Sequence, residues 1–211
     1  MTEHLLTAIT SISPLDGRYA QKCRSLAEIR SEYGLMRYRV EVEVKWLQTL
    51  ASHPGVAELK PLSDTQIATL DGLFLDFGLE DALQVKDIES KTNHDVKAIE
   101  YFIKQKLERL DGFGEYLEFV HFACTSEDIN NLAYGLMLAQ ARESVLIPQM
   151  QGTVDSLKAL SIEFASQPLL SRTHGQPATP STVGKEFANV AFRLQRQLEK
   201  FNNINILGKI N

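Results

Sequence analysis

Four clusters of polar side chains contain the residue types that anion binding and acid–base chemistry require. Residues 16–19 read Asp-Gly-Arg-Tyr, a turn followed by a guanidinium and a phenol. Residues 89–95 (ESKTNHD) and 121–131 (HFACTSEDINN) combine hydroxyl, amide, imidazole and carboxylate groups. Residues 171–181 (SRTHGQPATPS) place a histidine in a segment rich in glycine and proline. Each cluster lies at an expected boundary between elements, where functional side chains concentrate.

The chemistry that these clusters suit is the binding of an anion with proton transfer beside it. Backbone N–H groups at a helix start near Thr125 and Ser126 would bind a carboxylate or a phosphate. Arg18 and Arg172 can hold such a group through two parallel hydrogen bonds. His174, in its turn, would titrate near neutral pH and serve as a general acid.

The same residues also have interpretations that need no ligand. Thr125 to Asp128 fit a capping box, in which a hydroxyl and a carboxylate satisfy the helix start by themselves. Arg18 and His174 would then be ordinary surface residues. The other histidines have similar alternatives: a local hydrogen bond between His94 and Asp95, a buried position for His121, and surface positions for His4 and His53.

The phosphate-loop, HExxH, paired CxxC and GxSxG motifs are absent from the sequence, and its composition excludes several classes of protein. Gly112-Phe113-Gly114 lacks the third glycine of a dinucleotide loop, and no metal-binding spacing occurs, so we expect no metal. The net charge is 22 − 27 = −5, which excludes a broadly basic nucleic-acid binder. No apolar run reaches 18 residues, the N-terminus does not resemble a secretory signal, and Cys23 and Cys124 form no disulfide framework. We therefore expect a cytoplasmic protein without membrane or nucleic-acid partners.

Hydrophobic periodicity predicts mostly helices. A helix should begin at Thr125 as N-cap and run to about residue 166, kinked but not ended by Pro148. A second long helix should begin with Thr179 as N-cap and Pro180 at N1. Residues 63–77 and 80–109 are also predicted as helices, the latter interrupted near residues 92–95.

Residues 31–52 are ambiguous, because valines alternate with charged residues as they would in a strand. The segment also fits a helix through Met36, Val40, Leu47 and Leu50, and the lack of a nearby partner strand favours the helix.

The predicted helices are long for a chain of this size. A helix over residues 126–166 would be roughly 60 Å long, whereas a compact 211-residue globule is about 43 Å across. Its apolar stripe then needs cover from other chains or from further sequence, so we expect an oligomer built on a helix bundle.

Taken together, the strings SPLDGRY, KTNHDVKAIEY, EFVHFACTSEDINN and LLSRTHGQPATPSTVGKE resemble the bacterial adenylosuccinate lyase family, within the fumarase/aspartase superfamily. The resemblance covers residues 6–211. It implies an all-α homotetramer, with a small N-terminal helical domain (1–111) followed by the first part of a central long-helix bundle (112–211). The implied reaction is β-elimination of fumarate from adenylosuccinate to give AMP, and from SAICAR to give AICAR, without a metal or organic cofactor.

The resemblance also implies roles for individual residues. His174 would be the general acid that protonates the departing nitrogen. The residues implied to bind the succinylated purine nucleotide are Arg18 and Tyr19 at its nucleotide end, Thr125 and Ser126 at its succinyl carboxylate, Asn93, His94 and Asp95 along the site, His121 as a further site histidine, and Lys91 and Gln176 as weaker candidates.

One part of the family pattern is missing from the sequence. The family's base is a serine on a loop that reads roughly S-S-x-M-P-x-K-x-N-P, and no such segment occurs. The resemblance therefore implies an N-terminal half that is inactive alone. Two alternatives remain open: a non-catalytic helical protein on the same scaffold, and a superfamily lyase with a different amino-linked succinyl substrate.

Overall fold

The computed structural model of the chain describes residues 9–210, and the contacts within it divide the described residues into two units. Residues 9–139 and 207–210 form the first unit, and residues 140–206 form the second. His4 lies outside the described residues. Helices dominate both units, so the prediction of a mainly helical fold is confirmed.

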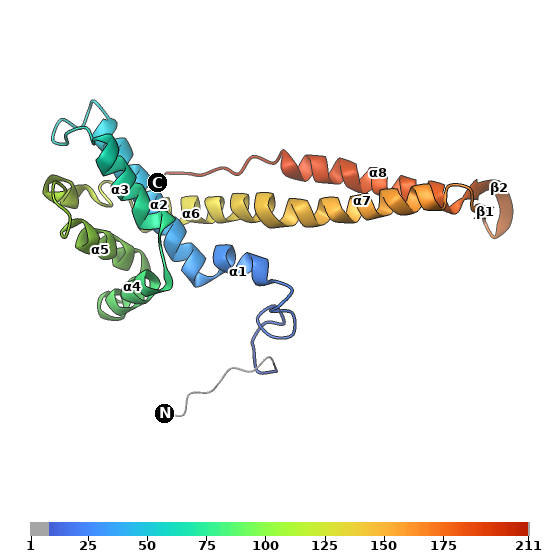
Figure 1. Ribbon diagram of the computed structural model, residues 1–211, viewed down its shortest axis with the longest axis horizontal. Coiled ribbons are helices and arrows are strands. Elements are labelled where there is room, and N and C mark those ends of the chain that lie inside the picture. The colour runs from blue at the N-terminus through green and yellow to red at the C-terminus, as the bar shows by residue number, and fades with distance from the viewer. Residues whose placement is uncertain (1–8, 211) are drawn as a thin grey trace. The chain divides into compact units, whose positions relative to one another are not determined.

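The first unit is a helical cluster around one long central helix (Figure 1). Its elements are α1 (Arg24–Arg30), α2 (Glu32–Ser52), α3 (Asp64–Leu75), α4 (Leu79–Thr92), α5 (Asp95–Leu107), the 3₁₀ helix η1 (Gly114–Phe119) and most of α6 (Ser126–Ala141). Helix α2 packs against α1, α3, α4, α5 and η1. Its residues Val40, Val44 and Leu47 are fully buried, with Ile99 and Phe102 of α5 in the same core.

This packing resolves the ambiguity at residues 31–52, which are helical as favoured above. The alternating pattern arises because α2 is covered on several sides, so that its buried face is unusually wide. The break predicted near residues 92–95 is also present. Asn93 there adopts a left-handed conformation (φ 52°) and ends α4, and His94 caps α5.

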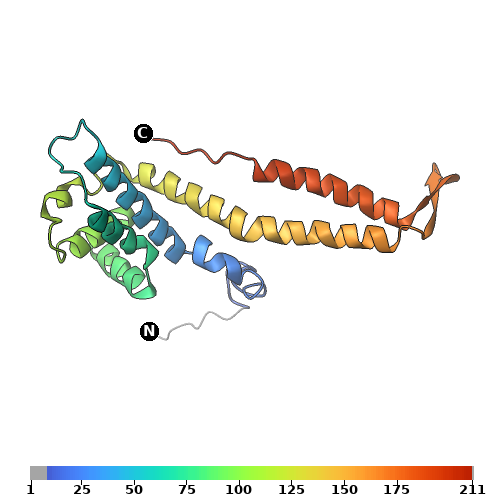
Figure 2. The same ribbon diagram turned by 45° about the horizontal axis from the view of Figure 1, so that its top comes forward.

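The second unit consists of a helix pair and a β-hairpin. Helix α7 (Ile147–Glu163) and helix α8 (Val183–Asn202) lie side by side in both ribbon views (Figures 1 and 2). Strands β1 (Pro168–Thr173) and β2 (Gln176–Thr182) connect them as an antiparallel pair. A π-helical turn, η2 (Arg142–Leu146), precedes α7. Helix therefore continues past Pro148, as predicted, and the π turn lies where the proline removes a backbone donor.

The hairpin corrects two predictions. Residues 171–181 are not a simple turn between helices, and α8 begins at Val183 with Thr182 as N-cap, not at Thr179 and Pro180. The Thr182 hydroxyl accepts the Lys185 N–H at 3.1 Å. Residues that precede proline prefer extended backbone, which keeps Gln176 and Thr179 in a strand.

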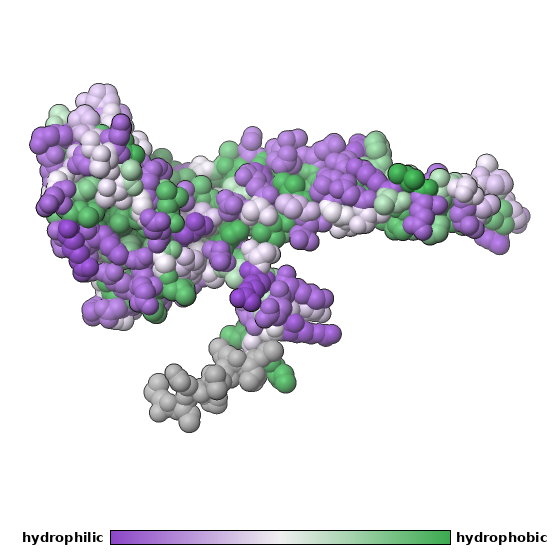
Figure 3. Space-filling view, viewed as in Figure 1, coloured by the Kyte–Doolittle hydropathy of each residue, from purple (hydrophilic) through white to green (hydrophobic). Residues whose placement is uncertain are grey.

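Several large apolar side chains on the long helices are exposed to solvent, and Figure 3 shows hydrophobic patches among hydrophilic ones on the visible face of the helix pair. On α6 these side chains are Leu132, Tyr134, Leu136 and Leu138, and on α8 they are Val190, Phe192 and Leu194. Among the described residues, none of the helices combines the length and the apolar character needed to cross a membrane.

Candidate functional site

One face of α2 organises the polar part of the first unit. Arg39, Glu43 and Trp46 follow one another at spacings of four and three, so they form a row along the helix. Each of the three reaches a segment far away in sequence. Arg39 binds the starts of α5 and α6, and Glu43 and Trp46 bind the loop that leads into α6.

Arg39 is buried and joins two helix starts. Its Nη2 donates to Asp95 Oδ2 at 2.6 Å, and its Nε donates to Asn130 Oδ1 at 2.9 Å. Partial burial of Asp95 opposes its charge, but the Arg39 guanidinium outweighs that effect and holds the pKa of Asp95 below its ordinary value. A buried cation thus fixes the N-termini of α5 and α6 relative to α2.

His94 lies between these two helix starts. Its Nδ1 accepts the Lys97 N–H at 3.1 Å as the N-cap of α5, so in the neutral ring the proton is on Nε2. That Nε2 lies 3.4 Å from the Ser126 hydroxyl, at the first residue of α6. Two helix N-termini, with their partial positive charge, therefore converge on His94 and Ser126.

A pocket of about 370 Å³ opens beside His94. Its lining comes from α2, α4 and the junction between α4 and α5, and consists of Glu32, Leu35, Met36, Arg39, Val85, Glu89, Asn93, His94 and Asp95. Lys86 binds both Glu32 and Glu89 at 2.8 Å, and these two hydrogen bonds raise its pKa to about 12. The two glutamates at the pocket therefore share one lysine, which neutralises one of their two negative charges.

In the capping box predicted at the start of α6, the Asp128 carboxylate binds the N-cap residue Thr125. Asp128 Oδ2 accepts the Thr125 backbone N–H at 2.7 Å and the Thr125 hydroxyl at 2.8 Å. The Thr125 hydroxyl proton is therefore directed at Asp128, whereas Ser126 faces His94.

His121 is half-buried, less than the buried position that one interpretation anticipated, and it is paired with a carboxylate. Its Nδ1 lies 2.6 Å from Oε1 of Glu43, whose side chain is fully buried. The hydrogen bond to Glu43 raises the pKa of His121, and burial only partly opposes this. His121 also adopts a left-handed conformation, with φ 65°.

Arg18 and Tyr19 lie together elsewhere in the first unit. The Arg18 guanidinium is 5.5 Å from the centroid of the Tyr19 ring. Both residues line a second pocket, of about 430 Å³, with Ile9, Ile12 and Pro14. Lys91 forms an exposed ion pair with Asp87 at 2.6 Å and lines neither pocket.

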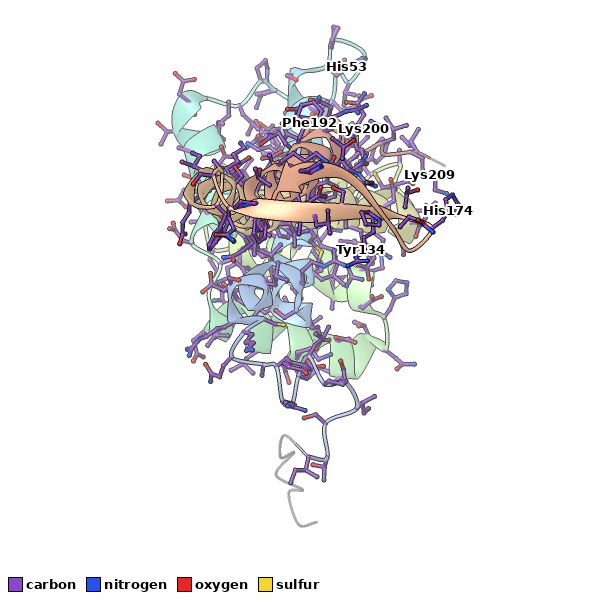
Figure 4. The ribbon with its side chains drawn as sticks, turned by 90° about the vertical axis from the view of Figure 1, so that its right-hand side faces the viewer. His53, Tyr134, His174, Phe192, Lys200 and Lys209 are labelled. Atoms are coloured by element: carbon purple, nitrogen blue, oxygen red, sulfur yellow. The ribbon has the colours of Figure 1, made fainter. Side chains whose placement is uncertain are left out.

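His174 and Gln176 belong to the second unit. Thr173 pairs with Gln176, so His174 and Gly175 form a two-residue turn, where Figure 4 labels His174. Their φ angles of 50° and 78° are those of a type I′ turn. The imidazole is therefore carried by the two-residue turn at the tip of a β-hairpin.

The structure brings Asn93, His94, Asp95 and Ser126 together, and Thr125 directly precedes Ser126 in the sequence. His121 instead contacts Glu43 of α2, and Arg18 and Tyr19 line a separate pocket. The exposed His53 accepts the Gly55 N–H, a local turn contact. Among the described residues, no group of three or more His, Cys, Asp or Glu side chains is placed to hold a metal ion.

The cluster at residues 121–131 includes Asn130, but sequence reasoning gave Asn130 no role and did not single out Arg39, Glu43 or Trp46. One feature of the sequence pointed to Arg39 and Glu43: both are charged and lie beside the apolar positions of the same helix. Charged residues are rarely buried unless they are paired, so their place on a buried face marks them as partners of something distant.

Comparisons with known proteins identify the family of the chain. The lyase family matches residues 17–210. Over 206 residues the chain is 52% identical to adenylosuccinate lyase of Escherichia coli K12 and 53% identical to that of Haemophilus influenzae. Both alignments cover 98% of this chain and 45% of the relative, so the chain spans about half the length of these relatives.

Two solved structures share the fold. A fumarate lyase from Mesorhizobium sp. BNC1 has a TM-score of 0.63 at 19% identity, over 84% of this chain and 39% of that one. The 3-carboxy-cis,cis-muconate lactonizing enzyme of Pseudomonas putida has a TM-score of 0.60 at 20% identity, over 84% and 38%. Because the family match extends over nearly all of the sequence, the chain belongs to the lyase family.

Proposed function

We propose that the protein containing these residues is an adenylosuccinate lyase of purine biosynthesis. It would release fumarate from adenylosuccinate to leave AMP, and from SAICAR to leave AICAR. The observation that carries the proposal is the identity of about half of all residues with adenylosuccinate lyases along 98% of the chain. The converging starts of α5 and α6 support it, because the substrate is a multiple anion.

Each proposed residue has a task in the elimination. Ser126, with Thr125, binds the succinyl carboxylate at the start of α6, where the helix N-terminus stabilises the charge that develops during proton abstraction. His94, Asn93 and Asp95 line the same region. Arg18 and Tyr19 bind the nucleotide end through a cation and an aromatic ring, with His121, Lys91 and Gln176 as further contacts. His174 protonates the leaving nitrogen.

The general base of the reaction is assigned to none of these side chains. The 211 residues hold no Ser-Ser-x-Met-Pro segment. We propose that the base comes from sequence outside these residues, and that residues 1–211 alone do not catalyse the reaction.

The assembly is part of the same proposal. The apolar side chains exposed on α6 and α8 would be covered by other copies in a homotetramer, with the region 112–211 as the start of a shared helix bundle and 1–111 as the helical domain before it. A cytoplasmic location would suit the two free cysteines.

Substitution of His174 in the complete gene product tests the proposal. His174→Asn keeps the turn, because Asn-Gly is a favoured type I′ pair, and removes the proton donor. We expect the rate of fumarate release to fall at least about 100-fold, the usual contribution of a positioned general acid. Gly175→Ala is the matched control, since it strains the same turn but leaves the imidazole in place.

Full activity in His174→Asn would contradict the assignment of the acid. A complete, folded gene product that releases no fumarate from either substrate would contradict the lyase function itself and favour a non-catalytic helical protein.

A further inference from the structure

Glu43 is a fully buried carboxylate that the proposed reaction does not yet use. Its Oε1 contacts His121 Nδ1 at 2.6 Å. Its Oε2 is also buried and has no hydrogen-bond partner among the described residues. A half-satisfied carboxylate in a protein interior costs stability and calls for an explanation.

The histidine that Glu43 holds is in a strained loop. His121 (φ 65°) and Ala123 (φ 58°) both have left-handed backbone without being glycine, a conformation that collects at functional sites. The Trp46 indole N–H donates to the Phe122 carbonyl at 2.8 Å, so α2 fixes the loop at two successive residues. This loop leads directly to Thr125 and Ser126.

The second nitrogen of this ring, Nε2, is available to a ligand. No hydrogen bond to His121 Nε2 is formed by the described residues, and Nε2 is not among the buried atoms that lack a partner. The imidazole therefore has one nitrogen bound to a buried carboxylate and the other exposed, which is the arrangement of an oriented donor.

None of the other charged or titratable groups described around the pair forms an ion pair with Glu43. From α5, Glu100 is close but is itself bound by Lys97 at 2.7 Å and by Lys104 at 3.1 Å. From the loop, burial and the charges of Glu43 and Asp128 raise the pKa of the Cys124 thiol to about 11, so it stays protonated at neutral pH. His121 is then the one proton donor bound to Glu43 among the described residues.

We propose that Glu43 is a positioning residue of the lyase site, which holds His121 as an imidazolium with its Nε2–H directed at an anionic oxygen of the substrate. The proposal rests on the lyase function and adds to it the residue that orients His121. Glu43 contacts no substrate; its carboxylate accepts a hydrogen bond from Nδ1–H, fixes the ring and stabilises its positive charge.

The sign of the pH dependence follows from the pair. Burial raises the pKa of Glu43, and the hydrogen bond and charge of the His121 ring oppose that rise, so the ionised carboxylate and the protonated ring stabilise each other. His121 should therefore stay charged to a higher pH than an ordinary histidine. Neutralising Glu43 removes that support, and the ring then loses its proton at lower pH. In such a variant, the affinity for the anionic substrate should therefore begin to fall at a lower pH than in the wild type.

The test compares Glu43→Gln, Glu43→Asp and Asp81→Asn in the complete gene product. Asp81→Asn is the matched control: it also neutralises a carboxylate in an ion pair of the first unit, with Lys106 at 2.6 Å, but contacts no histidine. kcat/KM for adenylosuccinate is measured from pH 6 to 9. The titration of His121 is followed by NMR of ¹³Cε1-labelled histidine, with its signal assigned by its loss in His121→Asn.

We expect Glu43→Gln to move the alkaline limb of kcat/KM to lower pH by about one unit, a loss of roughly tenfold at pH 8 that shrinks towards pH 6. Glu43→Asp should keep the limb near its original position, and Asp81→Asn should not move it. In the NMR titration, the pKa of His121 should fall in Glu43→Gln.

Equal losses at every pH with an unmoved limb would overturn the proposal and leave Glu43 a structural residue. A wild-type His121 that titrates no higher than an ordinary histidine would overturn it too, even if Glu43→Gln does not fold. A wild type without lyase activity would instead overturn the proposed function, and the NMR titration would still separate that failure from a failure of the Glu43–His121 pair.

Discussion

At the scale of single residues, His94 combines two tasks that usually fall to different side chains. Its Nδ1 caps α5, and its Nε2 faces Ser126 on α6. The cap fixes the tautomer, because a nitrogen that accepts a backbone N–H carries no proton in the neutral ring. The secondary structure itself thus determines which nitrogen of His94 can donate to a ligand.

Substitution of His94 separates these tasks. His94→Asn keeps a good N-cap and removes the imidazole, whereas His94→Ala removes both. We expect His94→Ala to lower the free energy of unfolding by about 1 kcal/mol and His94→Asn to leave it nearly unchanged. KM for adenylosuccinate should rise in both. Urea denaturation and steady-state kinetics measure the two effects, and an unchanged KM in His94→Asn would exclude a binding role.

Arg39 should stabilise the molecule in a pH-dependent way. Arg39→Leu removes hydrogen bonds to Asp95 and Asn130, and we expect a loss of about 1–2 kcal/mol at neutral pH, reduced by the solvent around the half-exposed Asp95. The pKa of Asp95 is lowered in the folded state, so this stabilisation is present above the ordinary pKa of aspartate and is lost as the pH falls through the lowered one.

Urea denaturation of wild type and Arg39→Leu at pH 7 and at pH 3 measures this dependence. The difference in unfolding free energy should be smaller at pH 3, and Arg39→Lys should lie between the two proteins. A difference that does not depend on pH would mean that the Arg39–Asp95 pair contributes nothing beyond packing.

At the scale of elements, the helices were predictable and the hairpin was not. Helices α2 to α7 follow from apolar spacing, caps and breaks such as Asn93, all of which are local in sequence. Strands β1 and β2 contain three prolines and largely exposed residues, so no apolar alternation marks them. Pairing between residues such as Leu169 and Ser181 creates them, and a scan of local periodicity does not detect such pairing.

The candidate site shows the same division. Ser126, His94 and Asp95 stood out because they lie at helix ends, which local sequence identifies. Arg39 and Glu43 did not, because their partners are 56 and 78 residues away along the chain. Which face of α2 contacts the loop between η1 and α6 depends on how the whole unit folds. Local patterns in a single sequence do not reveal such a contact.

The packing of α8 on α7 gives a prediction with a built-in control. A Cβ on Gly184 would collide with the Ser161 carbonyl and the Ala165 backbone, whereas a Cβ on Gly152 in α7 would meet nothing. We expect Gly184→Ala to destabilise the helix pair by about 1–3 kcal/mol and Gly152→Ala to stabilise it by up to about 1 kcal/mol. Thermal unfolding followed by circular dichroism distinguishes these outcomes; equal effects would contradict the close approach at Gly184.

At the scale of the whole molecule, the exposed apolar side chains on the long helices indicate a surface for assembly with other chains. Val190 and Leu194 lie one turn apart on α8 and are each about two-fifths exposed. Adjacent exposed apolar side chains of this size are typical of surfaces that bind another chain.

The double substitution Val190→Glu with Leu194→Glu should therefore weaken the proposed tetramer. Burying two carboxylates without partners costs several kcal/mol, so we expect smaller species at micromolar concentration in sedimentation velocity. Lys200→Glu, an exposed change near the end of the same helix, is the control and should leave the assembly intact. An unchanged oligomer in the double variant would mean that this face of α8 stays in solvent.

Trp46 gives the protein an intrinsic optical reporter. It is the only tryptophan among the 211 residues, and its indole N–H is bound to the carbonyl of Phe122, next to His121. Indole emission changes colour and intensity when that hydrogen bond or the surrounding polarity changes. A ligand that moves the loop between η1 and α6 would thus alter the fluorescence of unlabelled protein, and stopped-flow mixing would time this motion separately from the chemical step.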